Sequence, residues 1–117
     1  MILAIVDDLM FTSKIKATAT QLGVPLMFAR SSANALAEMR KSRPTLVILD
    51  LNSQRSEPLA TLAAMKSDPT LADIPSVGFV SHVQTDLIDA ARQAGVGEVL
   101  ARSAFTVQLP EILSRGQ

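Results

Sequence analysis

The amino-acid sequence predicts an α/β fold in which a doubly wound sheet of five parallel strands carries helices on both faces. Short apolar runs of strand length alternate five times with longer segments whose apolar residues recur at helical spacing. The apolar runs are nearly continuous, which is typical of strands that are buried on both faces. No linker, composition shift or internal repeat divides residues 1–117, so we expect a single domain.

The first two strand–helix pairs follow from short apolar runs and from signals at helix ends. Strands are predicted at Ile2–Val6 and Pro25–Ala29. Gly23 ends the first helix, and a serine of Ser31–Ser32 caps the second, which must end before Pro44. The predicted apolar stripes are Phe11, Ile15, Ala19 and Leu22 in the first helix and Ala33, Leu36 and Ala37 in the second.

Three further pairs complete the pattern. The remaining strands are predicted at Thr45–Leu51, Ser76–Ser81 and Val96–Ala101. Pro58 opens the third helix, Gly95 ends the fourth, and Pro110 lies in the first turn of a short fifth helix. The prolines and aspartates of Ser67–Pro75 predict a loop. The apolar stripes are Leu59, Leu62 and Ala63, then Leu87, Ile88, Ala91 and Ala94, then Leu109, Ile112 and Leu113.

Composition excludes several classes of function. The chain has no cysteine, which excludes disulfides and thiolate metal sites, and its single histidine, His82, disfavours a transition-metal site. Basic and acidic residues number 11 each, so there is no basic footprint for nucleic acid and no polybasic membrane patch. No apolar run approaches a membrane span or a signal peptide. We therefore expect a soluble, cytoplasmic protein.

Charged and hydroxyl side chains follow the predicted strands at the edge where α/β sheets bind ligands. Asp7 and Asp8 follow the first strand, Asp50 ends the third, Ser81 ends the fourth and Arg102 follows the fifth. Carboxylates that meet there repel one another unless a cation joins them. Magnesium suits such a site because it accepts few carboxylates and keeps several waters.

Five segments occupy matching places on these strands: "VDD" at the end of the first, "LVILDLN" around Asp50, "KSDPTLADIP" before the fourth, "FVS" at its end and "AGVGEVLAR" through the fifth. In this order and spacing they resemble the receiver domain of bacterial two-component response regulators, over essentially the whole chain. The resemblance implies a flavodoxin-like (βα)5 fold. It also implies a receiver that is not an enzyme. Because the chain ends soon after the predicted fifth helix, we expect no room for an output domain.

The resemblance assigns roles to individual residues. Asp50 would be the phosphoryl acceptor, and Asp7, Asp8 and Asp50 would hold Mg²⁺ together with the backbone carbonyl of Asn52. The phosphoryl group would come from a phosphohistidine on a histidine kinase or a phosphotransfer protein. A conformational change would then signal to a downstream protein partner at the face of the fourth helix, fifth strand and fifth helix. A homodimer through that face is an alternative, and no direct nucleic-acid or membrane binding is expected.

The same edge of the sheet, which we call the rim, carries two further implied roles and several departures from the family pattern. Ser81 would bond the phosphoryl group, and Arg102 stands where the family carries lysine. The loop "NSQRSEP" lacks the family's Met-Pro pair and its glycine, His82 replaces a small residue, and Val99 replaces a frequent aromatic residue. These departures motivate an alternative function, a phosphorylation-independent docking or dimerisation module.

Simpler interpretations stay open for the rim residues. Asp7 and Asp8 could only cap the first helix, Ser81 could only cap the fourth, and Arg102 could be a solvated surface residue. A flavin carrier on the same fold ranks last. It would need a phosphate-cradling loop after the first strand and aromatic rings to stack the flavin, whereas the chain has neither tyrosine nor tryptophan.

Overall fold

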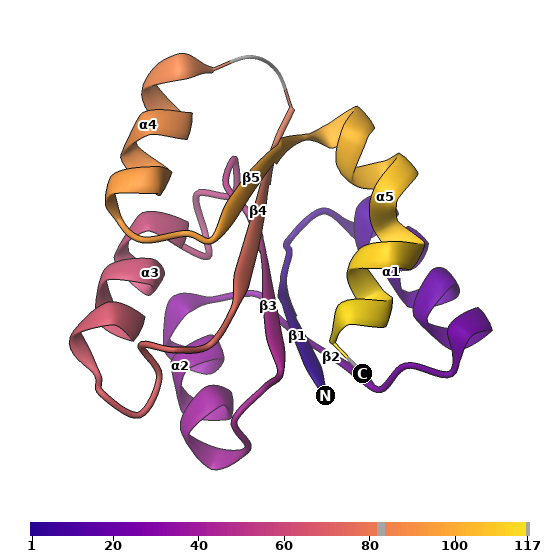
Figure 1. Cartoon of the computed structure of the whole chain (residues 1–117), viewed down its shortest axis with the longest axis horizontal. Coiled ribbons are helices and arrows are strands. Elements are labelled where there is room, and N and C mark those ends of the chain that lie inside the picture. Colours follow the sequence, from indigo (N-terminus) through magenta and orange to yellow (C-terminus); the bar gives the residue numbers. More distant parts are fainter. Residues whose placement is uncertain (82–83, 117) are drawn as a thin grey trace.

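The computed structural model describes residues 1–81 and 84–116, and strands and helices alternate along the chain (Figure 1). The strands join into one parallel sheet of order β2-β1-β3-β4-β5. The predicted doubly wound α/β fold is therefore confirmed. The elements are β1 (Ile2–Ile5), α1 (Leu9–Leu22), β2 (Leu26–Ala29), α2 (Ser32–Lys41), β3 (Leu46–Asp50), α3 (Pro58–Ser67), β4 (Ser76–Val80), α4 (Thr85–Gln93), β5 (Glu98–Ala101) and α5 (Arg102–Arg115).

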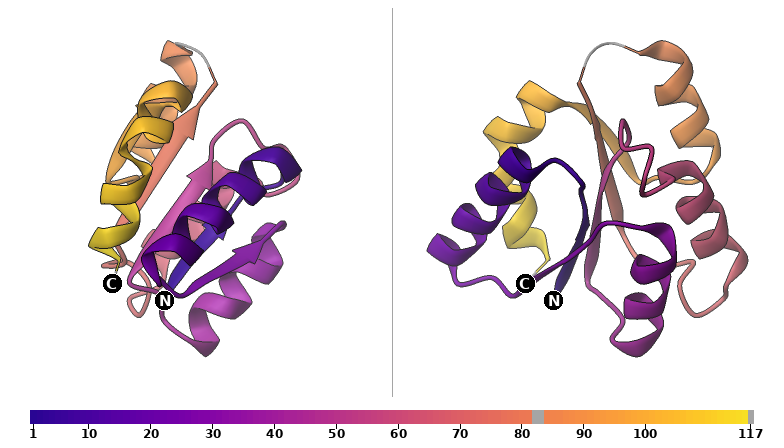
Figure 2. Two further views of the ribbon diagram at one scale, coloured as in Figure 1. Left: turned by 90° about the vertical axis from the view of Figure 1, so that its right-hand side faces the viewer. Right: turned by 180° about the vertical axis from the view of Figure 1, so that it is seen from behind.

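The helices form two layers around the sheet. Helices α1 and α5 lie side by side on one face, and α2, α3 and α4 cover the other, as Figure 2 shows from the side and from behind. Successive residues of β1 point to opposite faces. Ile2 and Ala4 pack in the core under α1 and α5, whereas Leu3 and Ile5 pack in the core under α2, α3 and α4.

Three phenylalanines fill the core under α1 and α5 near the carboxyl end of β4. Phe79 of β4 stacks on Phe105 of α5 with ring centroids 4.6 Å apart, and Phe11 of α1 meets the Phe79 ring edge-on at 4.7 Å. Phe11 also lies 5.6 Å from Phe105. Such arrangements match the preferred geometries of aromatic pairs. We call Phe11, Phe79 and Phe105 the phenylalanine cluster.

The carboxyl end of β3 is held from both faces. Asp50 is the last residue of β3, and strand alternation places its side chain on the same face as Ile48, under α1 and α5. Leu51 follows it and is buried on the opposite face. A Cβ atom at Gly78 of the neighbouring β4 would lie 2.8 Å from a methyl carbon of Leu51. The glycine therefore leaves the space that Leu51 needs beside Asp50.

Helix α5 differs from its prediction. It begins at Arg102 and not near Leu109, and Pro110 lies inside it on the exposed side. Phe105 is fully buried one turn before Leu109, so the apolar stripe extends to the start of the helix. Buried contacts on either side of Pro110 outweigh its poor helix propensity. As a consequence Arg102 is the first residue of a helix.

Helix α2 buries only part of the side predicted, because Leu36 packs against the core but the two predicted alanines do not. Ala35 and Met39 are buried, whereas Ala33 and Ala37 are exposed. The predicted start is correct, because the Ser31 hydroxyl accepts a hydrogen bond from the Asn34 N–H. Met39 carries far more apolar area than either alanine, so turning it inward buries more apolar surface. In α3, Leu62 is buried as predicted but Ala63 is exposed.

Candidate functional site

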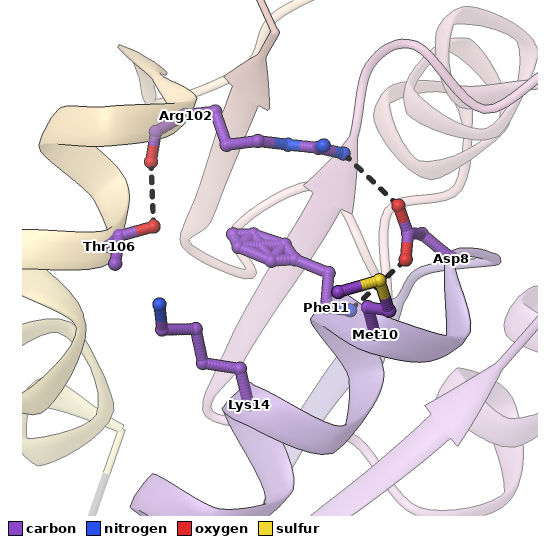
Figure 3. A pocket seen from close by; sticks show the side chains of 6 residues that line it. All are labelled: Asp8, Met10, Phe11, Lys14, Arg102 and Thr106. Atoms are coloured by element: carbon purple, nitrogen blue, oxygen red, sulfur yellow. Dashed lines mark hydrogen bonds and ion pairs between the residues drawn. The ribbon is translucent and has the colours of Figure 1, made fainter.

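One arginine links the acidic ends of two strands. Asp8 follows β1, Asp50 ends β3, and Arg102 begins α5 directly after β5. The Nη2 atom of Arg102 lies 3.7 Å from Asp8 Oδ2 and 4.0 Å from Asp50 Oδ2. Figure 3 shows the guanidinium reaching across to Asp8. The structure thus brings together three of the side chains that the sequence assigns to the rim.

The guanidinium of Arg102 rests on the phenylalanine cluster. Its Cζ atom lies 4.8 Å from the centroid of the Phe11 ring and 5.8 Å from that of Phe79. The Nε atom is buried and has no hydrogen-bond partner among the described residues. A cation over an aromatic face gains about 0.5–1 kcal/mol at exposed sites and more when it is desolvated. Arg102 therefore has a defined seat, unlike the solvated surface arginine that the sequence left open.

A second arginine, which the sequence analysis did not assign to the site, faces the third acid. Arg55 in the loop after β3 places Nη1 4.0 Å from Asp7 Oδ1. Three carboxylates, those of Asp7, Asp8 and Asp50, thus have two guanidinium groups beside them, and the local formal charge is −1 rather than −3. The signal for Arg55 was a cation within "NSQRSEP", a few residues after Asp50.

Each of the two linked carboxylates uses one oxygen on the backbone. Asp8 Oδ1 accepts the Phe11 N–H at 3.1 Å and so caps α1, while Asp50 Oδ1 accepts the Asn52 N–H at 3.0 Å. The helix-capping interpretation of Asp8 is therefore correct, and Asp8 faces Arg102 as well. In both carboxylates the second oxygen, Oδ2, is the one turned toward the guanidinium.

Asp50 is the most buried of these acids, with only 4% of its surface exposed. Burial raises the pKa of Asp50 above its ordinary value. The Asn52 N–H and the Arg102 charge lower that pKa, and the charges of Asp8 and Asp7 raise it again. The ionised form of Asp50 is therefore costly to the fold, and a nearby cation stabilises it.

The donor chemistry of the two linked acids fits a hard divalent ion. Asp8 Oδ2 and Asp50 Oδ2 face a common cation, and Mg²⁺ is typically bound through one or two carboxylates plus waters. Within residues 1–81 and 84–116, no three Asp, Glu, His or Cys side chains form a group that could hold a metal ion. Asp7 lies beside Arg55 instead. The full ligand set of Asp7, Asp8, Asp50 and the Asn52 carbonyl stays a prediction.

The Asn52 side chain has a structural role that the sequence did not reveal. Its Oδ1 accepts the Ser81 N–H at 2.7 Å, and its Nδ2 donates to Gln84 Oε1 at 2.6 Å. It therefore ties the loop after β3 to the residues that follow β4. Ser81 joins the site through this backbone contact, while His82, which replaces a small residue of the family, lies outside the described residues.

The Val99 position lies on the other side of the sheet from Arg102. Val99 in β5 is partly buried and packs against the core under α2, α3 and α4. The rim on the α1 and α5 side is therefore lined by other residues. There, a shallow pocket of about 240 Å³ is bordered by Asp8, Met10, Phe11, Lys14, Arg102 and Thr106 (Figure 3).

Comparison with known proteins gives matches among solved structures. No family model matches the chain, and no curated protein matches it. The phosphorylated cyanobacterial phytochrome response regulator RcpA is 28% identical with a TM-score of 0.81, and the match covers 96% of this chain and 86% of that one. The chemotaxis response regulator CheY4 of Vibrio cholerae is 18% identical with a TM-score of 0.84, covering 99% of this chain and 97% of that one.

A third match carries a metal ion. The receiver domain of a sensor histidine kinase from Pseudomonas aeruginosa, with a magnesium ion coordinated in its active-site cleft, is 17% identical with a TM-score of 0.85. The match covers 98% of this chain and 94% of that one. These structures are all response regulators or receiver domains, as the sequence resemblance predicts. The chain therefore has the fold of a response-regulator receiver domain.

Proposed function

We propose that the chain is a receiver that accepts a phosphoryl group on Asp50 from a phosphohistidine of a kinase or phosphotransfer protein, in a magnesium-dependent reaction. The observation that carries the proposal is the placement of Asp50. It is a buried carboxylate at the end of the central strand β3, and its Oδ2 atom faces a cation at the rim. The likeness to a phosphorylated response regulator at 28% identity supports the same activity.

The two carboxylate oxygens of Asp50 have different contacts. Oδ1 accepts the Asn52 N–H and Oδ2 faces Arg102, so the carboxylate is oriented at both oxygens. One carboxylate oxygen of Asp50 attacks the phosphorus and forms a P–O bond, while the P–N bond breaks and its electron pair returns to the imidazole, whose other ring nitrogen keeps its proton. Such transfers depend mainly on positioning and charge neutralisation. When bound, Mg²⁺ would supply further charge neutralisation at the phosphoryl oxygens.

Arg102 and Ser81 complete the proposed site. The Arg102 guanidinium lies within 4.0 Å of the Asp50 carboxylate and offers forked N–H donors to a phosphoryl oxygen. The Ser81 hydroxyl is proposed to bond the phosphoryl group, with its backbone held by Asn52. Because Asn52 also bonds Gln84, a movement of Ser81 would reach the start of α4.

The proposed partners follow from this role. The chain would be phosphorylated by a histidine kinase or phosphotransfer protein, would not act as an enzyme of its own, and would signal to a downstream protein at the face of α4, β5 and α5. We propose a cytoplasmic setting without direct nucleic-acid or membrane binding. Among the helices that the structure describes, none has the length and apolar character to cross a membrane. The phosphorylation-independent docking module is not favoured.

A mass measurement tests the proposal. The protein is incubated with magnesium and acetyl phosphate or phosphoramidate, and its intact mass is determined. We expect the gain of one phosphoryl group in the wild type and in Asp68→Asn, which alters a partly exposed acid far from the rim, but no gain in Asp50→Asn. An Asp50→Asn protein that gains the same mass would rule out Asp50 as the acceptor.

A further inference from the structure

We propose that Arg102 is the resident counter-ion of the Asp8–Asp50 pair and competes with the divalent ion for it, so that metal binds only as the guanidinium gives way. This inference rests on the proposed function, because it describes how the same site is regulated. It assigns to one residue of this chain a control over metal affinity. Three observations support it. Arg102 lies close to both carboxylates, its guanidinium packs on the phenylalanine cluster, and the arginines lower the local negative charge.

The shared position comes from the two short distances to a single nitrogen. Arg102 Nη2 lies 3.7 Å from Asp8 Oδ2 and 4.0 Å from Asp50 Oδ2. These oxygens are the atoms that each carboxylate has left after its backbone hydrogen bond. A dication that bridged Asp8 Oδ2 and Asp50 Oδ2 would lie where the guanidinium nitrogen now lies. The guanidinium and the ion therefore cannot both have full access to Asp8 and Asp50.

The seat keeps the guanidinium in this position. Its Cζ atom stands over the Phe11 ring at 4.8 Å, and its Nε atom is buried. Phe11 is itself fixed by edge contacts with Phe79 and Phe105. A lysine ammonium has no planar group to stack in this way and is more strongly hydrated. Arg102 is therefore held against the acids by packing as well as by charge.

The local charge weakens the attraction for a dication. Arg55 faces Asp7 and Arg102 faces the other two acids, so the three carboxylates have a net formal charge of −1 with their arginines. A positive charge within 4 Å of the carboxylate oxygens also repels an approaching ion directly. Once Asp50 carries a phosphoryl group, its guanidinium partner is free to turn to the phosphoryl oxygens, which offer the forked donors better acceptors.

The experiment measures metal binding directly and does not depend on an assay of phosphorylation. Mn²⁺ is titrated into the whole chain, and its dissociation constant is determined by calorimetry and by the electron paramagnetic resonance of free Mn²⁺. We compare the wild type with Arg102→Gln, Arg102→Lys and Arg40→Gln. Arg40 is the matched control, since it is an exposed arginine that also pairs with an aspartate, Asp68, but away from the rim.

We expect Arg102→Gln to bind Mn²⁺ at least about tenfold more tightly than the wild type, because a cation next to both ligands is removed. Arg102→Lys should bind more tightly than the wild type and more weakly than Arg102→Gln, and Arg40→Gln should equal the wild type. Equal or weaker binding by a folded Arg102→Gln would overturn the proposal. Should circular dichroism show that variant to be unfolded, Arg102→Lys decides by the same criterion.

The outcome is separable from that of the proposed function. If Mn²⁺ affinity rises in Arg102→Gln while the wild type gains no phosphoryl mass, the proposed competition between Arg102 and the metal is supported and the proposed phosphorylation of Asp50 is rejected. If the wild type is phosphorylated on Asp50 and Arg102→Gln leaves Mn²⁺ affinity unchanged, the receiver function stands and the competition fails.

Discussion

The two faces of the sheet are covered by different side chains and have different roles at the rim. Under α1 and α5, the phenylalanine cluster extends to the carboxyl edge and supports the Arg102 guanidinium. Under α2, α3 and α4, the core consists of aliphatic side chains with Met39 and Met65, and it includes Leu51, which follows Asp50. Aromatic rings offer a flat face for a cation, which aliphatic side chains do not. The charged site is therefore built on one face, while the other anchors the strand that carries the acceptor.

Strand β3 connects the charged site on one face with the anchoring core on the other. Asp50 points to the aromatic side, and Leu51 is buried on the aliphatic side in the space that Gly78 leaves. A rotation of the strand end would have to expose Leu51 or collide with β4. The position of Asp50 therefore depends on both cores, whereas the position of the Arg102 guanidinium depends on the aromatic core.

The largest expected effect separates the two cores. Phe79→Ala should lower the free energy of unfolding by about 3–5 kcal/mol, and Leu62→Ala on the opposite face by about 2–5 kcal/mol, because both residues are fully buried. Urea titrations measure both losses. Only Phe79→Ala should also shift the NMR signal of the Arg102 Nε–H, since Phe79 lies beneath that guanidinium.

Two results would contradict this difference between the faces of the sheet. A shift of the Arg102 signal that is equally large in Leu62→Ala would mean that the aromatic face has no special part in seating the cation. A loss below about 1 kcal/mol in Phe79→Ala would mean that the phenylalanine cluster repacks readily around the missing ring.

Strand polarity and apolar pattern explain why much of the fold and rim was predictable. Asp8, Asp50 and Arg102 each follow a short apolar run, and parallel strands bring such positions to one edge. The seat of Arg102 was not predictable in the same way. Phe11 and Phe79 come from different elements, and only their packing places a ring under the guanidinium. The start of α5 was missed because Pro110 suggested a helix beginning near it.

Other residues of the site were missed because their partners are distant in sequence. Arg55 meets Asp7 across 48 positions, and the Asn52 amide meets Gln84 across 32. Neither loop shows a periodic pattern, so nothing local indicates which way a side chain turns. The predicted face of α2 was wrong at its two alanines for a related reason. Ala33 and Ala37 have the same helical spacing as Ala35 and Met39, and only the tertiary packing selects between them.

A second prediction concerns the acid between the two cores. Asp50→Asn should raise the free energy of unfolding at pH 7 by about 1 kcal/mol, since it removes a buried charge near two other acids. Denaturant midpoints measured from pH 7 downward check it. The control is Asp68→Asn. The pKa of Asp68 is lowered by hydrogen bonds from Thr70, so the same replacement should not stabilise the fold.

The pH dependence of this gain has a definite sign. Burial raises the pKa of Asp50 above its unfolded value, so between the two values the folded state binds more protons than the unfolded state. The contribution of Asp50 to stability therefore increases as the pH falls through its folded pKa. The advantage of Asp50→Asn should be full above that pKa and should shrink below it. An advantage that grows toward acid pH would contradict the raised pKa.

The smallest expected effect lies in the loop on the aliphatic side, where Glu57 has a φ of 45° and caps α3 without a side-chain hydrogen bond. A left-handed backbone costs a non-glycine residue roughly 1–2 kcal/mol, and glycine removes that cost but loses more entropy on folding. Glu57→Gly should therefore stabilise the fold by about 0.5 kcal/mol, measured as a higher midpoint of thermal unfolding. Glu38→Gly inside α2 is the matched control and should destabilise by about 1 kcal/mol. Two variants that both destabilise would show that the Glu57 backbone carries no relievable strain.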